Sequence, residues 1–220
     1  MELTELLASN VQVFPLLGNY LAGEPYVFDF SSKNSKSFKY DTLNFNIFQN
    51  QIFEEILENN AIWGIGKYLE ERKNILRNYP QMIREKRFYH LGLDIIVPAG
   101  VSLFAPLDSK VFFCGVESGV GNYGGNVILE HRMGDNYFYS LYGHLKPNSS
   151  LFIGQNLFAG DFFSEIGEKE YSGGWFTHVH VQILTPLAVK KGMTNLGYIA
   201  EENLNSVSDY FPDPTPLFRF

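Results

Sequence analysis

Two histidines separated by one residue, His178 and His180, form the pattern in this sequence best suited to chemistry. They alternate with Val179 and Val181, a spacing typical of a β-strand, in which residues two apart point to the same face. Both imidazoles are therefore expected to project together. Two imidazoles on one face can hold a divalent metal ion, or one can bind it while the other acts on a water at the ion. The alternative is a polar strand face turned to solvent, because short motifs also match by chance.

A second pair, His90 and Asp94, combines an imidazole with a carboxylate four residues along the chain. Gly92 between them and the apolar run after them disfavour a helix. In an extended strand the two residues would lie ~13 Å apart, too far to share one ion through bonds of ~2 Å. The chain is therefore expected to bend at 91–93, where Gly92 supplies the conformational freedom.

His144 follows Tyr142 and Gly143 at the predicted end of a strand. Alone, a histidine there would be a surface or capping residue. Four of the five histidines, however, now fall in three compact motifs, each at the end or on the face of a β segment. Chance explains this grouping poorly, so the motifs are expected to serve one site.

From residue 89 onward the sequence predicts β structure that would position these motifs. Short apolar or alternating runs bounded by turn residues predict strands at 94–97, 101–104, 110–116, 126–131 and 137–142, the last two forming a hairpin. The glycines at 119–124 fit the dinucleotide-binding pattern, but a strand follows them instead of a helix, so they predict a tight connection between strands. Cys114, the one cysteine, excludes an internal disulfide and is interpreted as a small core residue in a buried strand at 111–114.

The first eighty residues predict a mixture of strands and helices instead of continuous β structure. Strands are expected at 26–30 and 43–47, around a polar loop at 31–39. Helical spacing of apolar residues at 52–57 predicts one helix, and a second is expected across 67–78, ended by Pro80. Both helices are interpreted as packing elements that carry no site residue.

Charge and hydropathy exclude some classes of function. The net charge is −7, and no run dense in Lys or Arg appears, so a nucleic-acid partner has no electrostatic basis. No stretch reaches the ~18 apolar residues that span a bilayer, and no basic residue precedes Lys33 to begin a signal peptide. The sequence thus predicts a cytoplasmic chain without membrane insertion.

Together the three motifs, in this order and at roughly these separations, resemble the lysostaphin-like zinc endopeptidases of bacterial cell walls. The residues that carry the resemblance are His90-Leu-Gly-Leu-Asp94, Tyr142-Gly-His144-Leu and His178-Val-His180. It implies an α+β fold with a predominantly antiparallel β-sheet catalytic core at 84–187. On this interpretation 1–83 is an N-terminal extension with two helices packed on the core, and 188–220 is a C-terminal tail that wraps the surface.

The resemblance also implies roles for the five residues. His90, Asp94 and His180 would bind one Zn²⁺ per chain and leave one position open. His144 and His178 would be the catalytic pair that polarises water and stabilises the oxyanion. Spacing alone does not make this division, because either imidazole of the His178–His180 pair can reach one ion. The implied activity is hydrolysis of amide bonds in peptide or peptidoglycan substrates.

The chain also departs from the family. Thr177 stands where Pro is common, Val181 where Phe is common, and Gln182 where Glu is frequent. None of these is an expected ligand, so metal binding should survive. Three alternatives stay open: a cytosolic zinc peptidase or amidase on a substrate outside the cell wall, a non-catalytic peptidase-like binding domain, and a structural zinc site. Non-catalytic relatives typically lose metal ligands, whereas this chain keeps the expected set.

Overall fold

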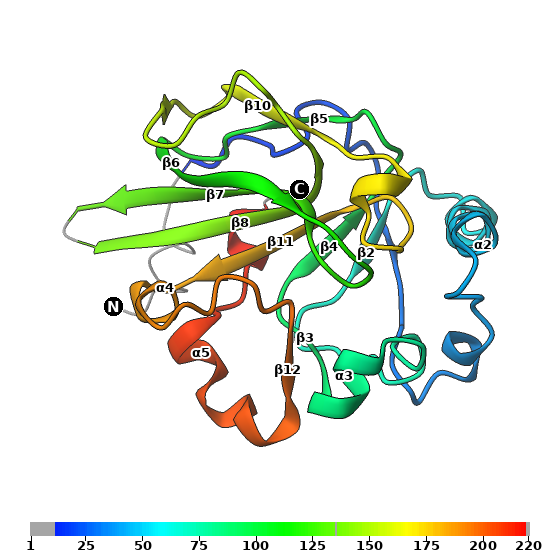
Figure 1. Cartoon of the computed structure of the whole chain (residues 1–220). Helices are drawn as coiled ribbons and strands as arrows, with labels where there is room; N and C mark the ends of the chain where they lie inside the picture. Colours follow the sequence, from blue (N-terminus) through cyan, green and yellow to red (C-terminus); the bar gives the residue numbers. More distant parts are fainter. Residues whose placement is uncertain (1–11, 135, 219–220) are drawn as a thin grey trace.

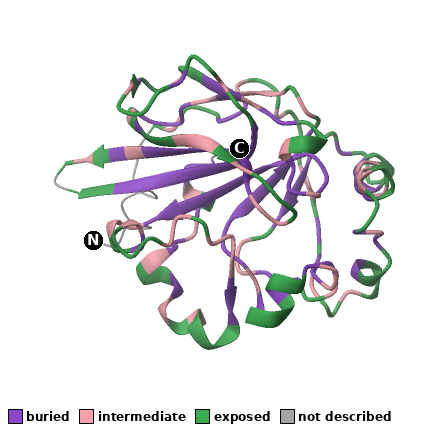
Figure 2. Cartoon of the chain, in the orientation of Figure 1, coloured by how far each residue is buried: buried purple, intermediate pink, exposed green. Residues whose placement is uncertain are grey.

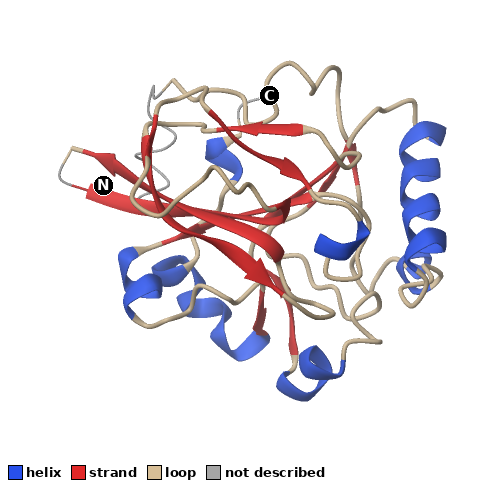
Figure 3. Cartoon of the chain, turned by 45° about the horizontal axis from the view of Figure 1, so that its top comes forward, coloured by secondary structure: helices blue, strands red, loops and turns tan. Residues whose placement is uncertain are grey.

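The central element of the structure is a large, mostly antiparallel β-sheet. The computed structural model describes residues 12–134 and 136–218, and its strands cross the middle of the molecule while short helices lie around the edge (Figures 1 and 3). The strand order is β1-β2-β4-β11-β8-β7-β6-β9, and β10 pairs with both β8 and β5. The predicted α+β fold, dominated by antiparallel sheet, is confirmed.

The bounds of the elements are as follows. The large sheet contains β1 (Tyr26–Val27), β2 (Gly64–Gly66), β4 (Leu93–Ile96), β5 (Ser102–Phe104), β6 (Ser109–Glu117), β7 (Gly124–Met133), β8 (Asn136–Lys146), β9 (Asn156–Leu157), β10 (Phe162–Ile166) and β11 (Val179–Leu184). A second, two-stranded sheet pairs β3 (Arg87–His90) with β12 (Tyr198–Ala200). The α-helices of the described residues are α2 (Phe45–Glu58), α3 (Pro80–Glu85), α4 (Pro186–Lys190) and α5 (Val207–Tyr210), and short 3₁₀ turns cover Ser35–Phe38, Lys169–Tyr171, Glu201–Ser206 and Thr215–Leu217.

Strand β11 shows why the central strands stay in place. All six of its residues are buried, and the middle of the sheet is buried throughout (Figure 2). Val179, Val181 and Ile183 alternate into the largest apolar cluster, and each such side chain contributes roughly 1.5–3 kcal/mol to stability. Alternation sends His180 and Gln182 to the opposite face, so the core that anchors β11 also aims its polar residues.

Helix α2 begins about two turns before the stretch that the apolar spacing suggested. Asn44 caps it, because the Asn44 side chain accepts a hydrogen bond from the Ile47 amide at 3.3 Å. The helix predicted at 52–57 is confirmed, and its buried face packs into the second apolar cluster. The strand predicted at 43–47 is wrong, since these residues form the cap and first turn of the helix.

The helix predicted across 67–78 is wrong. This stretch is a run of turns that lies along β3: the Leu69 amide donates to the His90 carbonyl at 2.8 Å, and the Arg72 amide donates to the Phe88 carbonyl at 2.9 Å. Leu69 also has a φ of 53°, in the left-handed region, which ends any helix there. Pro80 occupies the first turn of α3 instead of ending a helix.

Strand β6 is less buried than its composition suggested. Of residues 111–114, Val111 alone is buried, while Phe112 and Phe113 are 39% and 37% exposed and Cys114 is half-buried. The pairing of β6 with β7 shifts register between Val111 and Phe113, and the short β9 covers only part of its outer edge. The buried strand predicted there is therefore wrong, whereas the glycine-rich 119–124 segment connects β6 to β7 as predicted.

The C-terminal segment is more than a wrapping tail. Its strand β12 pairs with β3 and brings the Tyr198 ring to 5.2 Å from the His90 ring, centroid to centroid.

Among the described residues, none of the helices combines the length and apolar character needed to cross a bilayer. The prediction about a signal peptide concerns the first residues of the chain, and residues 1–11 lie outside the described part.

A buried histidine outside the three motifs predicts how stability responds to acid. His131 in β7 is fully buried, with Nε2 2.6 Å from the Ser140 hydroxyl and Nδ1 3.2 Å from the Asp108 carbonyl. Burial lowers the pKa of His131 from 6.5 to about 4. The unfolded chain therefore binds a proton more readily between these values, and the stabilising contribution of neutral His131 is lost as pH falls through this window.

We expect His131→Gln, which does not titrate, to lose less stability than the unmutated protein between pH 7 and pH 4.5. The difference should be about 2–3 kcal/mol in the free energy of unfolding. Urea unfolding of both proteins with chelator present measures it. Equal losses in the two proteins would show that His131 does not stay neutral in the folded state.

Candidate active site

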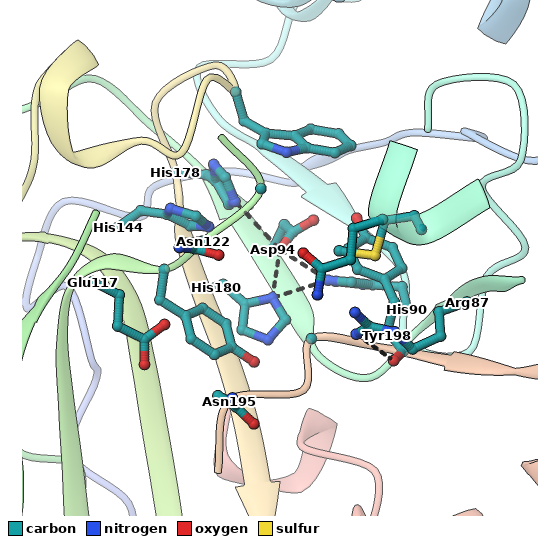
Figure 4. Close-up of a pocket in the computed structure, with 16 residues that line it drawn as sticks. Arg87, His90, Asp94, Glu117, Asn122, His144, His178, His180, Asn195 and Tyr198 are labelled. Carbon is teal, nitrogen blue, oxygen red and sulfur yellow. Dashed lines mark hydrogen bonds and ion pairs between the residues drawn. The ribbon is translucent and has the colours of Figure 1, made fainter. Parts of the chain in front are cut away.

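Three neighbouring strands bring the sequence motifs together. In the antiparallel pair of β4 and β11, Asp94 lies opposite His180. On the other side of β11, His180 lies opposite Gly143 of β8, the residue before His144. His178 immediately precedes β11, so both imidazoles of the pair reach the same place, as expected (Figure 4).

A bend at Leu91 and Gly92 adds His90 to the group. β3 ends at His90 and β4 begins at Leu93, so the predicted break in the strand is present. A Cβ atom on Gly92 would lie 2.5 Å from Cε1 of His180 and 2.6 Å from the Val181 carbonyl oxygen. Glycine is therefore required at this bend because the His180 ring passes directly over the backbone.

Three side-chain atoms converge with the spacing of ligands around one ion. His90 Nε2 lies 2.9 Å from His180 Nδ1, and Asp94 Oδ1 lies 3.2 Å from each of these nitrogens. Bonds of about 2.0 Å at tetrahedral angles place ligand atoms about 3.3 Å apart. All three residues are buried, and the triangle of donor atoms fits a single zinc ion without rearrangement.

Hydrogen bonds on the far side of each ring assign the protons. His90 Nδ1 lies 3.0 Å from the Lys67 carbonyl, so Nδ1 carries the proton and Nε2 carries a lone pair. His180 Nε2 lies 3.0 Å from Gln182 Oε1, which leaves the lone pair on Nδ1. The orientation of the Gln182 amide is fixed in turn, because its Nε2 donates to the Leu196 carbonyl at 3.1 Å.

These assignments leave three acceptors facing one another with no hydrogen between them. Buried acceptors normally face donors, and three of them at about 3 Å repel unless a cation lies between them. A proton is a poor candidate at His90, because burial lowers the pKa of His90 to about 3. The arrangement therefore favours a metal ion.

His178 and His144 lie beside this group. His178 Nδ1 donates to the Phe176 carbonyl at 2.8 Å, which leaves Nε2 as a lone pair 3.6 Å from Asp94 Oδ1. The His144 ring lies 4.3 Å from the His178 ring, centroid to centroid, and its Nδ1 has a longer contact of 3.4 Å with the Tyr171 carbonyl. Burial lowers the pKa of both histidines, so both are neutral near pH 7.

His144 also has an unusual backbone. It lies within β8 and not at a strand end, with a φ of 64° in the left-handed region. Its amide donates to the Tyr123 carbonyl and its carbonyl accepts from the Gly167 amide, so two loops hold it there. Left-handed backbone in a residue other than glycine costs of order 1–3 kcal/mol and clusters at functional sites.

Sequence reasoning missed the residues on the outer side of Asp94. The fully buried Arg72 donates to Asp94 Oδ2 at 2.6 Å and to Glu70 Oε2 at 3.1 Å, and it also reaches the Tyr198 hydroxyl at 3.3 Å. Burial alone would raise the pKa of Asp94, but His90 and the Arg72 guanidinium hold that pKa well below its ordinary value. A signal was present, because an arginine among the apolar residues of a supposed helix face requires a buried partner.

The cavity in front of the histidines is narrow. Its free volume of about 50 Å³ is enough for a few water molecules. Its walls come from the N-terminal segment, both loops beside His144 and the C-terminal segment, and include Met82, Asn122, Tyr123, Trp175, Asn195 and Tyr198 (Figure 4). A substrate must therefore present a slender stretch of backbone to reach the ligand triangle.

The close approach at Gly92 yields a prediction. Gly92→Ala should displace the His180 ring and weaken zinc binding by at least ten-fold. Changes to residues that orient a metal ligand typically lower metal affinity by this much. Competition with a chromogenic chelator measures the affinity. Gly192→Ala is the control: its φ of 69° strains an alanine, but nothing lies within 4 Å of the added atom. Unchanged zinc affinity in Gly92→Ala would contradict the placement of His180 at the metal.

Some known proteins are similar to part of this chain. Among curated proteins, none matches this sequence. A Pseudomonas aeruginosa protein described as an M23 peptidase is 23% identical over 58% of this chain and 43% of its own, with a TM-score of 0.39. The catalytic domain of lysostaphin from Staphylococcus simulans is 21% identical over 59% of this chain and 78% of its own, with a TM-score of 0.38.

These TM-scores are low, and the chain spans less than half of the Pseudomonas protein, so the assignment depends on a family model. Residues 88–193 match the model described as Peptidase family M23. The matched range contains all three histidine motifs, which confirms the resemblance found in the sequence. Residues 88–193 of this chain are therefore a domain of peptidase family M23.

Proposed function

We propose that this chain is a zinc-dependent endopeptidase that hydrolyses amide bonds of peptidoglycan-type peptides. The observation that carries the proposal is the triangle of His90 Nε2, Asp94 Oδ1 and His180 Nδ1, three acceptors at 2.9–3.2 Å with no hydrogen between them. The family match supplies the reaction class, a peptidase. The peptidoglycan-type substrate is an inference from the family and not from the shape of the cavity.

The three residues would hold one Zn²⁺ per chain. In the described part of the chain the metal-binding group has three members. Catalytic zinc sites have three protein ligands and an open position, whereas structural sites usually have four. When bound, zinc lowers the pKa of a water molecule and polarises the scissile carbonyl.

The two remaining histidines supply proton transfer. His178 keeps a lone pair on Nε2 because its Nδ1 proton is committed to the Phe176 carbonyl. Nε2 therefore accepts a proton from the attacking water and returns it to the leaving amine. The contact of His144 Nδ1 with the Tyr171 carbonyl, at 3.4 Å, is too long to fix the tautomer of this ring. The tautomer with its proton on Nε2 would stabilise the negative charge on the carbonyl oxygen.

The division into ligands and catalytic residues is testable with two variants. His144→Ala should keep one zinc per chain and lose turnover by 10²–10⁴-fold, the usual contribution of a proton-transfer group. Asp94→Ala should lose most of its zinc. Elemental analysis and hydrolysis of cross-linked wall fragments measure both, and circular dichroism checks that each variant is folded. Full turnover in zinc-bound His144→Ala, or unchanged zinc in Asp94→Ala, would contradict the assignment.

A comparison of substrates separates the proposed activity from its alternatives. The unmutated protein should cleave cross-linked wall fragments faster than generic peptides. Preference for generic peptides would indicate a zinc peptidase whose substrate lies outside the cell wall. Stable zinc binding without hydrolysis of either substrate would indicate a structural metal site.

The rate should fall in acid as the catalytic imidazoles gain protons. Burial lowers the pKa of both His144 and His178 from 6.5, so both remain neutral at pH 7 and become protonated only at lower pH. We expect turnover to be steady near pH 7 and to fall only in solution more acidic than the ordinary histidine pKa of 6.5. A profile of kcat against pH, with zinc content measured at each point, checks this. A fall in kcat that begins above pH 7, while zinc stays bound, would contradict a role for buried neutral histidines.

A further inference from the structure

The outer side of the Asp94 carboxylate is occupied by residues that lie before the M23 domain. Arg72 and Glu70 belong to the 67–78 stretch, outside residues 88–193. We propose that Arg72 is a positioning residue for Asp94, and that Glu70 offsets the charge of Arg72 so that the metal site can accept a cation. This inference rests on the zinc-binding part of the proposed function.

The two oxygens of Asp94 have separate partners. Oδ2 accepts from Arg72 Nη1 at 2.6 Å, while Oδ1 faces His90 and His180 at 3.2 Å. A charge-assisted hydrogen bond of this length fixes the rotation of the carboxylate. Oδ1 therefore faces the ion. Because Oδ2 is held by Arg72, the carboxylate cannot bind the ion through both oxygens and cannot rotate away from the histidines.

Arg72 itself has no freedom to move. Its side chain is fully buried, with the guanidinium carbon 5.1 Å from the centre of the Phe30 ring. A Cβ atom on Gly66 would lie 2.6 Å from Arg72 Nη2, so the adjacent strand β2 closes the space on that side. Such enclosure suits a group whose purpose is to hold another in place.

A buried guanidinium beside a metal site would repel a divalent cation if it stood alone. Glu70 removes this problem, since its Oε2 accepts from Arg72 Nε at 3.1 Å and its side chain is almost fully buried. The backbone amide of Phe30 donates to Glu70 Oε1 at 3.0 Å and fixes the carboxylate. Glu70 Oε1 also lies 3.4 Å from Nζ of Lys67, but the Lys67 side chain is 45% exposed, so solvent screens its charge. Among the buried charges, Glu70 offsets Arg72, and Asp94 keeps its negative charge for the ion.

The same stretch orients a second ligand. The Lys67 carbonyl accepts the Nδ1 proton of His90, and the His90 amide donates to the Glu70 carbonyl at 3.1 Å. Residues 67–72 therefore support both ligands contributed by the β3–β4 region. It follows that this part of the N-terminal segment is integral to the metal centre and is not a removable cover over it.

The test is zinc affinity in the full chain, measured by chelator competition. Arg72→Lys keeps a positive charge but cannot contact Asp94 and Glu70 together. Glu70→Gln keeps an acceptor for the Phe30 amide but removes the charge that offsets Arg72, so the Asp94 carboxylate alone pairs with the guanidinium. Both variants should bind zinc 10–100-fold more weakly, the usual effect of losing such a support.

The chain contains a matched control. Arg87 pairs with Glu85 at 2.7 Å, has the same two-residue separation from its partner, and is also buried. Its side chain donates to Glu85 and to the Tyr198 carbonyl, and to none of the three ligands. Arg87→Lys should bind zinc as tightly as the unmutated protein.

A spectroscopic measurement separates positioning from general stability. With Co²⁺ in place of zinc, the absorption bands report coordination geometry, and they should change in Arg72→Lys but not in Arg87→Lys. Melting temperatures with chelator present identify any variant that is simply unfolded. If Arg72→Lys is unfolded, the zinc affinity of Glu70→Gln tests the proposal instead. Zinc affinities and cobalt spectra of Arg72→Lys and Glu70→Gln equal to those of the unmutated protein would overturn the proposal. A protein that binds zinc normally but hydrolyses nothing would overturn the proposed function and leave this inference standing.

Discussion

Mutual repulsion among three buried acceptors is the constraint on which the rest of the structure depends. His90, Asp94 and His180 present two lone pairs and a carboxylate oxygen to one another within 3.2 Å, and the backbone and side-chain partners behind them leave no alternative orientation. The apolar packing of β4, β8 and β11 supplies the stability that holds these groups together. The fold thus maintains an arrangement of acceptors that a bound cation would stabilise.

Each ligand is oriented by a different kind of group. A backbone carbonyl fixes His90, a neutral amide fixes His180, and a compensated ion pair fixes Asp94. Gln182 stands where the resembling family frequently has Glu, and in this chain it leaves the Asp94 carboxylate as the one net negative charge among these groups. The orienting groups come from the N-terminal segment as well as from the M23 domain, so residues outside the family match contact the ligands of the proposed metal centre.

Local sequence patterns predicted the parts of the fold that depend on local physics. The β7–β8 hairpin, the bend at Gly92 and the shared face of His178 and His180 follow from turn residues, backbone freedom and strand alternation. Local patterns gave the wrong structure for the stretch at 67–78, because the spacing of its apolar residues fits a helix. Its backbone instead pairs with β3, and Leu69 adopts a left-handed conformation. Arg72 consequently looked like part of a packing face, and its role depends on Asp94, which lies 22 residues later in the chain.

The protonation of the two ligand histidines in the metal-free protein tests this account most directly. Long-range ¹H–¹⁵N NMR distinguishes the two ring nitrogens of each imidazole. We predict that His90 carries its proton on Nδ1 and His180 on Nε2, and that added zinc shifts the resonances of His90 Nε2 and His180 Nδ1. A proton on either of these two inward-facing nitrogens at pH 7, or no response of these nitrogens to zinc, would contradict the account.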